Sequence, residues 1–483
     1  MKDILELMLR LPADIARIGA EQMQNSIRQN ENVSTESYFD DVSGPQSFGD
    51  DFHQSSIAGT FVPPSDDRRA PVTRTGEQNV ALGSLDLSTL VVVGDSFMAG
   101  EGSFSLAAAS QQNSICAQLA RQAGVGFKQL NFEALQLSSP FGSNSNLRFP
   151  DHRWSMEPRV TSFGNQSNLV GLNNYSIPRY RLIDALDLVT SLPTIQSSNS
   201  KHSLANIVLA NPHQAQFTPQ TQLQMALERH PTFMMICLGF WDIAEPLFCG
   251  HPEEIPRTDQ LVESFDRLFR LLHTKRIEGV VFNVANPIDT AAYSTIEQAA
   301  HVLCVPGEFL ISRYRLSPGD RLTVSGLVEI GVQINRGTLA PLLDKHILRS
   351  ELAEQVTGKV NEVNQFISSQ LRRDGQIDVF DLASMFARLE KGDLASSSLS
   401  SHYLGGFFAL NGYSLGDTAN ALIANQLSSQ LNSKYLAEIP AIDTAIVAQS
   451  DSVADSQIAG GSMWSMSRLN LSLIHISEPT RPY

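Results

Sequence analysis

The sequence predicts an α/β protein built on a parallel sheet. Apolar runs with the character of buried strands alternate with helical segments over most of the chain, a pattern typical of strand–helix–strand units. Two turns, Gly94-Asp95-Ser96 and Gly239-Phe240-Trp241-Asp242, directly follow two of these apolar runs. Ligands on such sheets lie beyond the carboxyl ends of the strands, so we expect a site at these turns.

The individual elements follow from this alternation. We expect five parallel strands, with Val91–Val93, Met234–Leu238 and Val280–Val284 as the central ones and a further strand in IDVFDL (377–382). Helices are predicted between or after these runs, at 114–124, 221–229, 260–273, 353–373 and 420–431.

The remaining segments lie outside this α/β domain, which we expect to span residues 85–440, with a tail at 441–470. Residues 1–28 carry apolar side chains at helical spacing and predict an amphipathic helix, which packs on the domain or binds a membrane surface or a protein partner. Residues 29–84 read as a flexible acidic linker. Residues 471–483 contain LSLIHISEPTR, which matches the translation of a sequencing adapter, so we expect them to be read-through rather than native sequence.

Composition excludes several function classes. The 483 residues are 42% hydrophobic, enough for a substantial core, and the net charge of −15 argues against nucleic acid or an acidic membrane as the main partner. Four cysteines show no metal spacing, and Cys116 and Cys237 are expected to be buried free thiols. No metal cluster, nucleotide-binding motif, transmembrane run or secretory signal is evident, so we expect no cofactor and a cytoplasmic location.

Several motifs occur together in the order of one known family. They are VVVGDSFMAGEGS, HPTFMMICLGFWDIAE, IEGVVFNVANPIDT, LSPGDRLTVSGL and YLGGFFALNGYSLGDTANALIANQLSSQLN. From about Leu87 to Ile439 the chain resembles a bacterial branch of the GDSL, or SGNH, hydrolases, which are lipases and esterases. The resemblance implies a flavodoxin-like α/β/α fold and no cofactor.

The same resemblance identifies the site residues. Ser96 matches the nucleophile, and Asp95 is expected to hydrogen-bond backbone in its turn. The family's Asp-Gly-x-His is replaced by Asn411-Gly412-Tyr413-Ser414, so Asn411 stands for the orienting Asp and Ser414 for the base. A hydroxyl is not a useful base near neutral pH, and Ser96 therefore lacks its proton acceptor.

The donors to the oxyanion are altered as well. The family's Asn is replaced by Trp241, in the turn that starts at Gly239, and the segment with the family's Gly matches Asn174–Tyr180, with Arg179 at the Gly position. We expect Trp241 to fill the pocket and the backbone N–H of Arg179 to remain a donor. Glu101 is expected to be a solvated loop carboxylate.

These substitutions predict a catalytically impaired member of the family, a pseudoenzyme with a binding or scaffolding role. Arg179 and Trp241 favour an anion or a planar small molecule as ligand. The alternative is an active ester or lipid hydrolase that uses Ser96 with a non-standard base, such as His402 or His251. A third hypothesis is an interaction protein that works through its N-terminal helix and linker.

Overall fold

The computed structural model describes residues 80–103, 105–132, 135–136, 171–189, 200–209, 219–392 and 399–451. The chain divides into two compact units, one formed by Met1–Asp67 with Val332–Ala340 and the other by Arg68–Gly331 with Pro341–Tyr483. Of the first unit only residues 332–340 are described, and they include the end of one helix, α12 (Val324–Arg336). The predicted N-terminal helix, nearly all of the linker and the adapter-like segment lie outside the described residues.

The second unit contains a parallel sheet of four strands in the order β1-β4-β5-β9. These are β1 (Leu90–Gly94), β4 (Phe233–Cys237), β5 (Gly279–Phe282) and β9 (Ile377–Phe380). Each strand falls in an apolar run that the sequence singles out, so the predicted α/β class with a parallel sheet is confirmed. The strands β1, β4 and β5 are almost entirely buried, which explains their continuous apolar character.

The predicted number of five strands is wrong for the regular sheet, because a fifth segment pairs only in part. Residues 173–177 run parallel to β1, and the Val92 N–H donates to the Asn173 carbonyl at 2.7 Å while the Tyr175 N–H donates to the Val92 carbonyl at 2.9 Å. The Asn174 side chain turns back to accept the Ser176 N–H, which interrupts regular strand geometry. Counted with this segment, the chain order across the sheet is 2-1-3-4-5, and the order reverses between β1 and β4.

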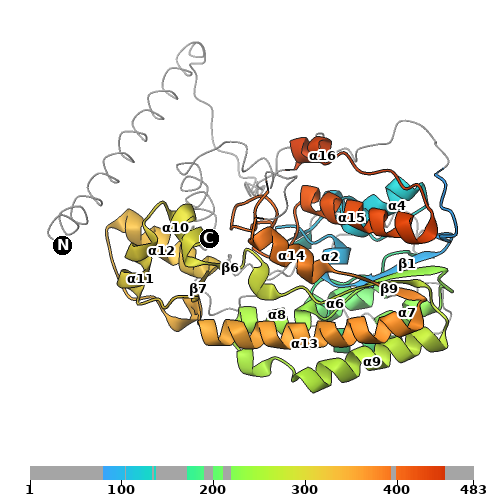
Figure 1. Ribbon diagram of the computed structural model, residues 1–483, viewed down its shortest axis with the longest axis horizontal. Coiled ribbons are helices and arrows are strands. Elements are labelled where there is room, and N and C mark those ends of the chain that lie inside the picture. Colours follow the sequence, from blue (N-terminus) through green and yellow to red (C-terminus); the bar gives the residue numbers. More distant parts are fainter. Residues whose placement is uncertain are drawn as a thin grey trace, which may run out of the picture. The chain divides into compact units, whose positions relative to one another are not determined.

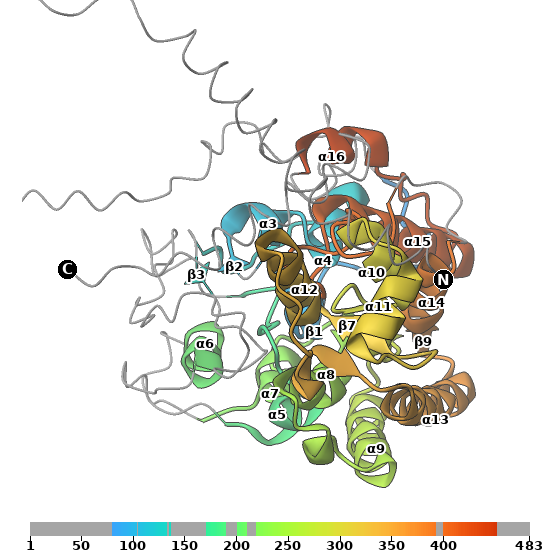
Figure 2. The ribbon, with the colours of Figure 1, turned by 90° about the vertical axis from the view of Figure 1, so that its left-hand side faces the viewer.

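Helices flank the sheet on both faces (Figures 1 and 2). On one face α4 (Ile115–Ala123) packs against α15 (Asp417–Tyr435), and on the other α9 (Thr258–Thr274) packs against α13 (Ser350–Asp374), with α7 (Gln222–Leu227) against β1. The five helices lie where the sequence predicts them. In α9, for example, the buried residues recur at helical spacing, as Leu261, Phe265, Leu268 and Leu272.

Shorter helices complete the helical layers and the connections. They are α2 (Ser96–Ala99), α3 (Ala108–Gln112), α5 (Leu182–Asp187), α6 (Ser200–Val208), α8 (Phe240–Cys249), α14 (Leu382–Glu390) and α16 (Thr444–Ser450). A two-stranded ribbon of β2 (Ser105–Leu106) and β3 (Leu135–Gln136) follows α2 in the chain. α16 lies in the segment that the sequence predicts as a tail, and Asp451 just after it accepts the Thr418 N–H at 2.8 Å.

An insertion between β5 and α13 forms a second, antiparallel sheet. Its strands are β6 (Tyr293–Ser294), β7 (Arg321–Thr323) and β8 (Ile347–Leu348), in the order β6-β7-β8. The helices of this insertion are α10 (Ile296–Leu303), α11 (Gly307–Tyr314) and α12 (Val324–Arg336), and short 3-10 turns lie at η4 (Pro287–Asp289) and η5 (Asp344–His346). The motif LSPGDRLTVSGL supplies β7 and the start of α12.

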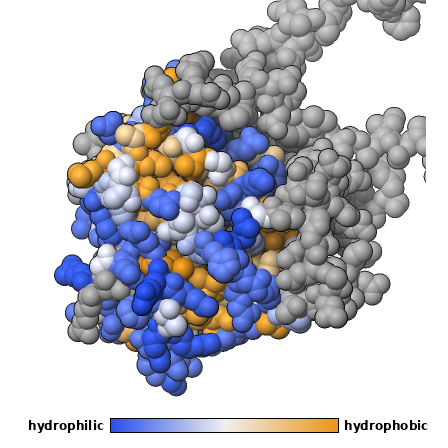
Figure 3. All heavy atoms as spheres, turned by 90° about the vertical axis from the view of Figure 1, so that its right-hand side faces the viewer, coloured by the Kyte–Doolittle hydropathy of each residue, from blue (hydrophilic) through white to orange (hydrophobic). Residues whose placement is uncertain are grey.

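The cysteines agree with the expectation from composition. Cys116 and Cys237 are buried free thiols, as predicted, and burial raises the pKa of Cys116 to about 11. Within the described part of the chain, no helix is long and apolar enough to cross a membrane. Figure 3 shows one face on which apolar side chains lie among polar and charged ones.

Candidate functional site

Ser96 lies at the carboxyl end of β1, as the first residue of the short helix α2. Asp95 caps this helix, because its carboxyl oxygen accepts the Phe97 N–H at 3.1 Å. Burial raises the pKa of Asp95 well above its usual range, and the nearby Asp242 and Glu101 act in the same direction. The contacts of Asp95 are those of a residue that stabilises the turn.

The hydroxyl of Ser96 receives a hydrogen bond from a backbone amide. The Arg179 N–H donates to Ser96 Oγ at 3.0 Å, and Ser96 itself is only 2% exposed. The Ile177 N–H donates to the Gly94 carbonyl at 3.1 Å, which ties the Arg179 segment to the end of β1. Gln222 on α7 reinforces this tie, because its amide donates to the carbonyls of Gly94 and Tyr175 at 2.9 and 2.8 Å.

Arg179 has a left-handed backbone, with a φ of 62°. This conformation favours glycine, the residue that the resemblance expects at this position. Arg179 therefore has a backbone conformation that glycine adopts without strain, although it carries a long side chain.

The side chain of Arg179 is nearly buried, and it contacts the carboxylate of Glu101 and the hydroxyl of Tyr413. Its Nη2 lies 3.3 Å from Glu101 Oε1 and donates to the Tyr413 hydroxyl at 3.1 Å, while that hydroxyl donates to Glu101 Oε1 at 2.6 Å. Burial and the neighbouring Glu101 keep the pKa of Tyr413 well above its usual range, so it remains a neutral donor. The expectation that Glu101 is solvated is wrong, because its side chain is 0% exposed and pairs with Arg179.

Trp241, near the start of α8, packs against Arg179 and Tyr413. Its ring is fully buried, the Arg179 guanidinium carbon lies 5.7 Å from the ring centroid, and Tyr413 meets the ring edge-on at 5.0 Å. Gly239 precedes the helix with a φ of 101°, and a side chain there would collide with Phe265. We refer to Arg179, Glu101, Trp241 and Tyr413 together as the Arg179 cluster.

Asn411 and Ser414 hydrogen-bond to each other rather than to Ser96. The Asn411 amide donates to Ser414 Oγ at 2.8 Å and to the Gly102 carbonyl at 3.0 Å, and its oxygen accepts the Ser414 N–H at 2.9 Å. Both residues are buried. This network fixes the loop that carries Tyr413 against the Glu101–Ser103 segment, and it contains no group that takes a proton near neutral pH.

Neither histidine considered as a replacement base bonds to Ser96. His251 is 58% exposed and pairs with Glu253, whereas His402 packs against His301 with ring centroids 5.9 Å apart. Burial, and then His301, lower the pKa of His402. Among the described residues no imidazole hydrogen-bonds to Ser96 Oγ, and His152 and His213 lie outside them.

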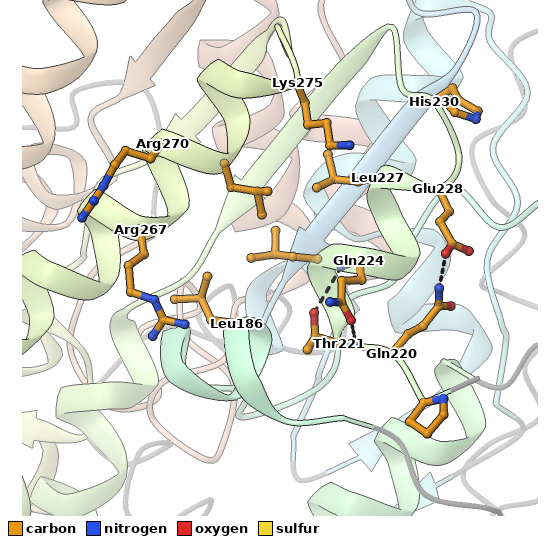
Figure 4. Close-up of a pocket in the computed structure, with 13 residues that line it drawn as sticks. Leu186, Gln220, Thr221, Gln224, Leu227, Glu228, His230, Arg267, Arg270 and Lys275 are labelled. Atoms are coloured by element: carbon orange, nitrogen blue, oxygen red, sulfur yellow. Dashed lines mark hydrogen bonds between the residues drawn. The ribbon is translucent and has the colours of Figure 1, made fainter. Parts of the chain in front are cut away.

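A separate pocket of about 960 Å³ lies on the helical layer formed by α5, α7 and α9 (Figure 4). Leucines line it together with cationic groups from α9, and it contains no residue of the Arg179 cluster. Arg267 is held by Asp187 at 2.6 Å, and Arg270 pairs with Asp266, so two of these cations already have carboxylate partners. Among the described residues, no group of three or more His, Cys, Asp or Glu side chains has a geometry that holds a metal ion.

Comparison with known proteins leaves the family open. The sequence matches no model of a known protein family, and no curated protein is similar enough to give a match. The structure itself establishes an α/β protein with a parallel four-stranded sheet. The geometry of the site therefore carries the functional argument.

Proposed function

We propose that this chain has an SGNH-type fold whose hydrolase site has become a packed, non-hydrolytic centre, so that the protein acts by binding or scaffolding. The 2-1-3-4-5 order supports the flavodoxin-like assignment. Ser96 and Gly239 follow β1 and β4, the two strands between which the order reverses, and this is where such folds bind ligands.

The observation that carries the proposal is the environment of the Ser96 hydroxyl. It accepts the Arg179 N–H, and within the described residues no side chain that can act as a base hydrogen-bonds to it. The loss of the base of a catalytic triad lowers kcat by about 10⁶. The loss of an oxyanion donor such as the family's Asn, here Trp241, lowers kcat by a further ~10²–10³.

The identity of a ligand for this centre, an anion or a planar small molecule, stays a prediction. Arg179 already faces Glu101, so an anion that binds to the guanidinium has to displace this carboxylate. That competition favours a role in which the Arg179 cluster stabilises the fold, with binding at the surface of the domain. A small ester or anion and a protein partner of the N-terminal helix remain the alternatives.

The purified protein is expected to hydrolyse short p-nitrophenyl esters no faster than its Ser96→Ala variant, because Ser96 has no proton acceptor. The measurement is the initial rate of both proteins on a panel of acyl chain lengths, with equal folding checked by circular dichroism. A wild-type rate about a hundredfold or more above the variant, roughly 2.7 kcal/mol of barrier, would reveal a base and overturn the proposal.

A further inference from the structure

The antiparallel sheet of the insertion encloses a buried histidine that the proposed function does not use. His346 ends the turn η5, directly before β8, and is 1% exposed. Its Nδ1 lies 3.0 Å from Ser325 Oγ, which in turn lies 2.8 Å from Thr323 Oγ1. The chain of polar groups thus joins β7, the start of α12 and the beginning of β8 through one imidazole.

The second nitrogen of this imidazole has no hydrogen-bond partner in the described part of the chain. His346 Nε2 is buried, and no hydrogen bond reaches it from the described residues. A doubly protonated ring would therefore hold a charged N–H without an acceptor, which is costly in a buried site.

Neighbouring charges do not offset this cost. Burial lowers the pKa of His346 to about 4, Lys345 on η5 acts in the same direction, and Glu329 on α12 opposes both. Arg321 on β7 pairs with Glu390, and Arg349 after β8 pairs with Asp320, so these two cations are directed to other partners. The imidazole consequently stays neutral at pH 7, and its hydrogen bond to Ser325 helps to hold the sheet together.

The small sheet also supports the Arg179 cluster. Thr323 on β7 pairs with Tyr293 on β6, and the Val324 N–H donates to the Ala292 carbonyl at 3.2 Å. The backbone of Ala292 lies under Gly412, which has a φ of 81° and where an added Cβ would come within 2.9 Å of it. The turn that presents Tyr413 therefore rests on the edge of the sheet that His346 holds together.

We propose that His346 is an acid-sensitive latch: its protonation loosens the β6-β7-β8 sheet and, through Ala292, the turn that carries Tyr413. This proposal does not depend on the resemblance to hydrolases. The unfolded segment takes up a proton below about pH 6.5 and the folded one only near pH 4, so the stability of the sheet falls as the pH drops through this window. Below about pH 4, where both states are protonated, this group causes no further loss of stability.

The test is hydrogen–deuterium exchange of the full chain at pH 6.5 and 4.5, with rates corrected for the intrinsic effect of pH. In the wild type, amides of residues 321–349 and 407–416 should open at least about tenfold more at the lower pH, whereas those of β4 should not change. In His346→Asn, which keeps an amide near the position of Nδ1 but does not titrate, this response should disappear. His251→Asn, on the surface, should respond like the wild type.

An unchanged wild-type exchange between the two pH values overturns the proposal, whatever the variants do. An equal response in wild type and His346→Asn overturns it too, because other groups then cause the opening. If residues 321–349 open while 407–416 stay protected, the connection to Tyr413 is refuted. If His346→Asn does not fold at neutral pH, Ser325→Ala takes its place and should open the sheet at pH 6.5, with β4 as the internal reference.

Discussion

Replacement of Arg179 by methionine should lower the free energy of unfolding by about 3–5 kcal/mol, the usual cost of removing one partner of a buried ion pair. The change leaves the Glu101 carboxylate buried at 0% exposure without its guanidinium, and it removes a donor to Tyr413. Methionine keeps a side chain at the same left-handed φ, so the backbone strain cancels in the comparison. The measurement is urea unfolding of both proteins.

Two further variants distinguish the loss of the buried Arg179–Glu101 interaction from the general effect of removing a positive charge. Arg181→Met removes a cation two residues away that is 40% exposed and pairs with Asp184 at 3.1 Å, and it should cost less than about 1 kcal/mol. Glu101→Gln in the Arg179→Met background should recover part of the loss, because the uncompensated charge is then gone. If the two changes were simply additive in a double-mutant cycle, Arg179 and Glu101 would not interact and the Arg179 cluster would be misdescribed.

The strands of the parallel sheet and the five main helices can be predicted from the sequence, because their patterns lie within short segments. Each strand of the parallel sheet is a short continuous apolar run, and each of the five predicted helices repeats its apolar residues at helical spacing; these patterns do not depend on distant contacts. The predicted fifth strand is the exception. The sequence does not indicate which segment forms it: residues 173–177 pair with β1, but the Asn173 and Asn174 side chains bond to backbone and break the regular ladder.

The site is predictable only where it follows from backbone geometry. Arg179 is one such case, because any residue other than proline keeps its backbone N–H, and this N–H donates to Ser96 Oγ. The environment of Glu101 could not be anticipated, because Arg179 and Tyr413 lie 78 and 312 residues away in the sequence. Nothing in the sequence around Tyr413 signals its role, since the residue occupies the unspecified position of the motif Asp-Gly-x-His.

Trp241→Ala should destabilise the domain by about 3–5 kcal/mol, because it empties a fully buried volume between Tyr413, Phe248 and Arg179. Trp241→Phe is the matched control and should cost no more than about 1.5 kcal/mol, because a phenyl ring preserves part of the edge-to-face packing. The indole Nε1 that it removes has no hydrogen-bond partner among the described residues. Urea unfolding of the three proteins gives both values.

A further variant tests whether the oxyanion donor of the SGNH hydrolases, to which we propose this fold is related, can be placed at position 241. Trp241→Asn brings in the amide of those enzymes, but it leaves the cavity of the alanine variant and adds a buried polar group, so it should be at least as unstable as Trp241→Ala. The changes Asn411→Asp and Ser414→His would also have to fit into a buried site where these two residues already hydrogen-bond to each other. If Trp241→Asn were instead as stable as the wild type, the ring would be lying in an open cleft and the packed-centre proposal would fail.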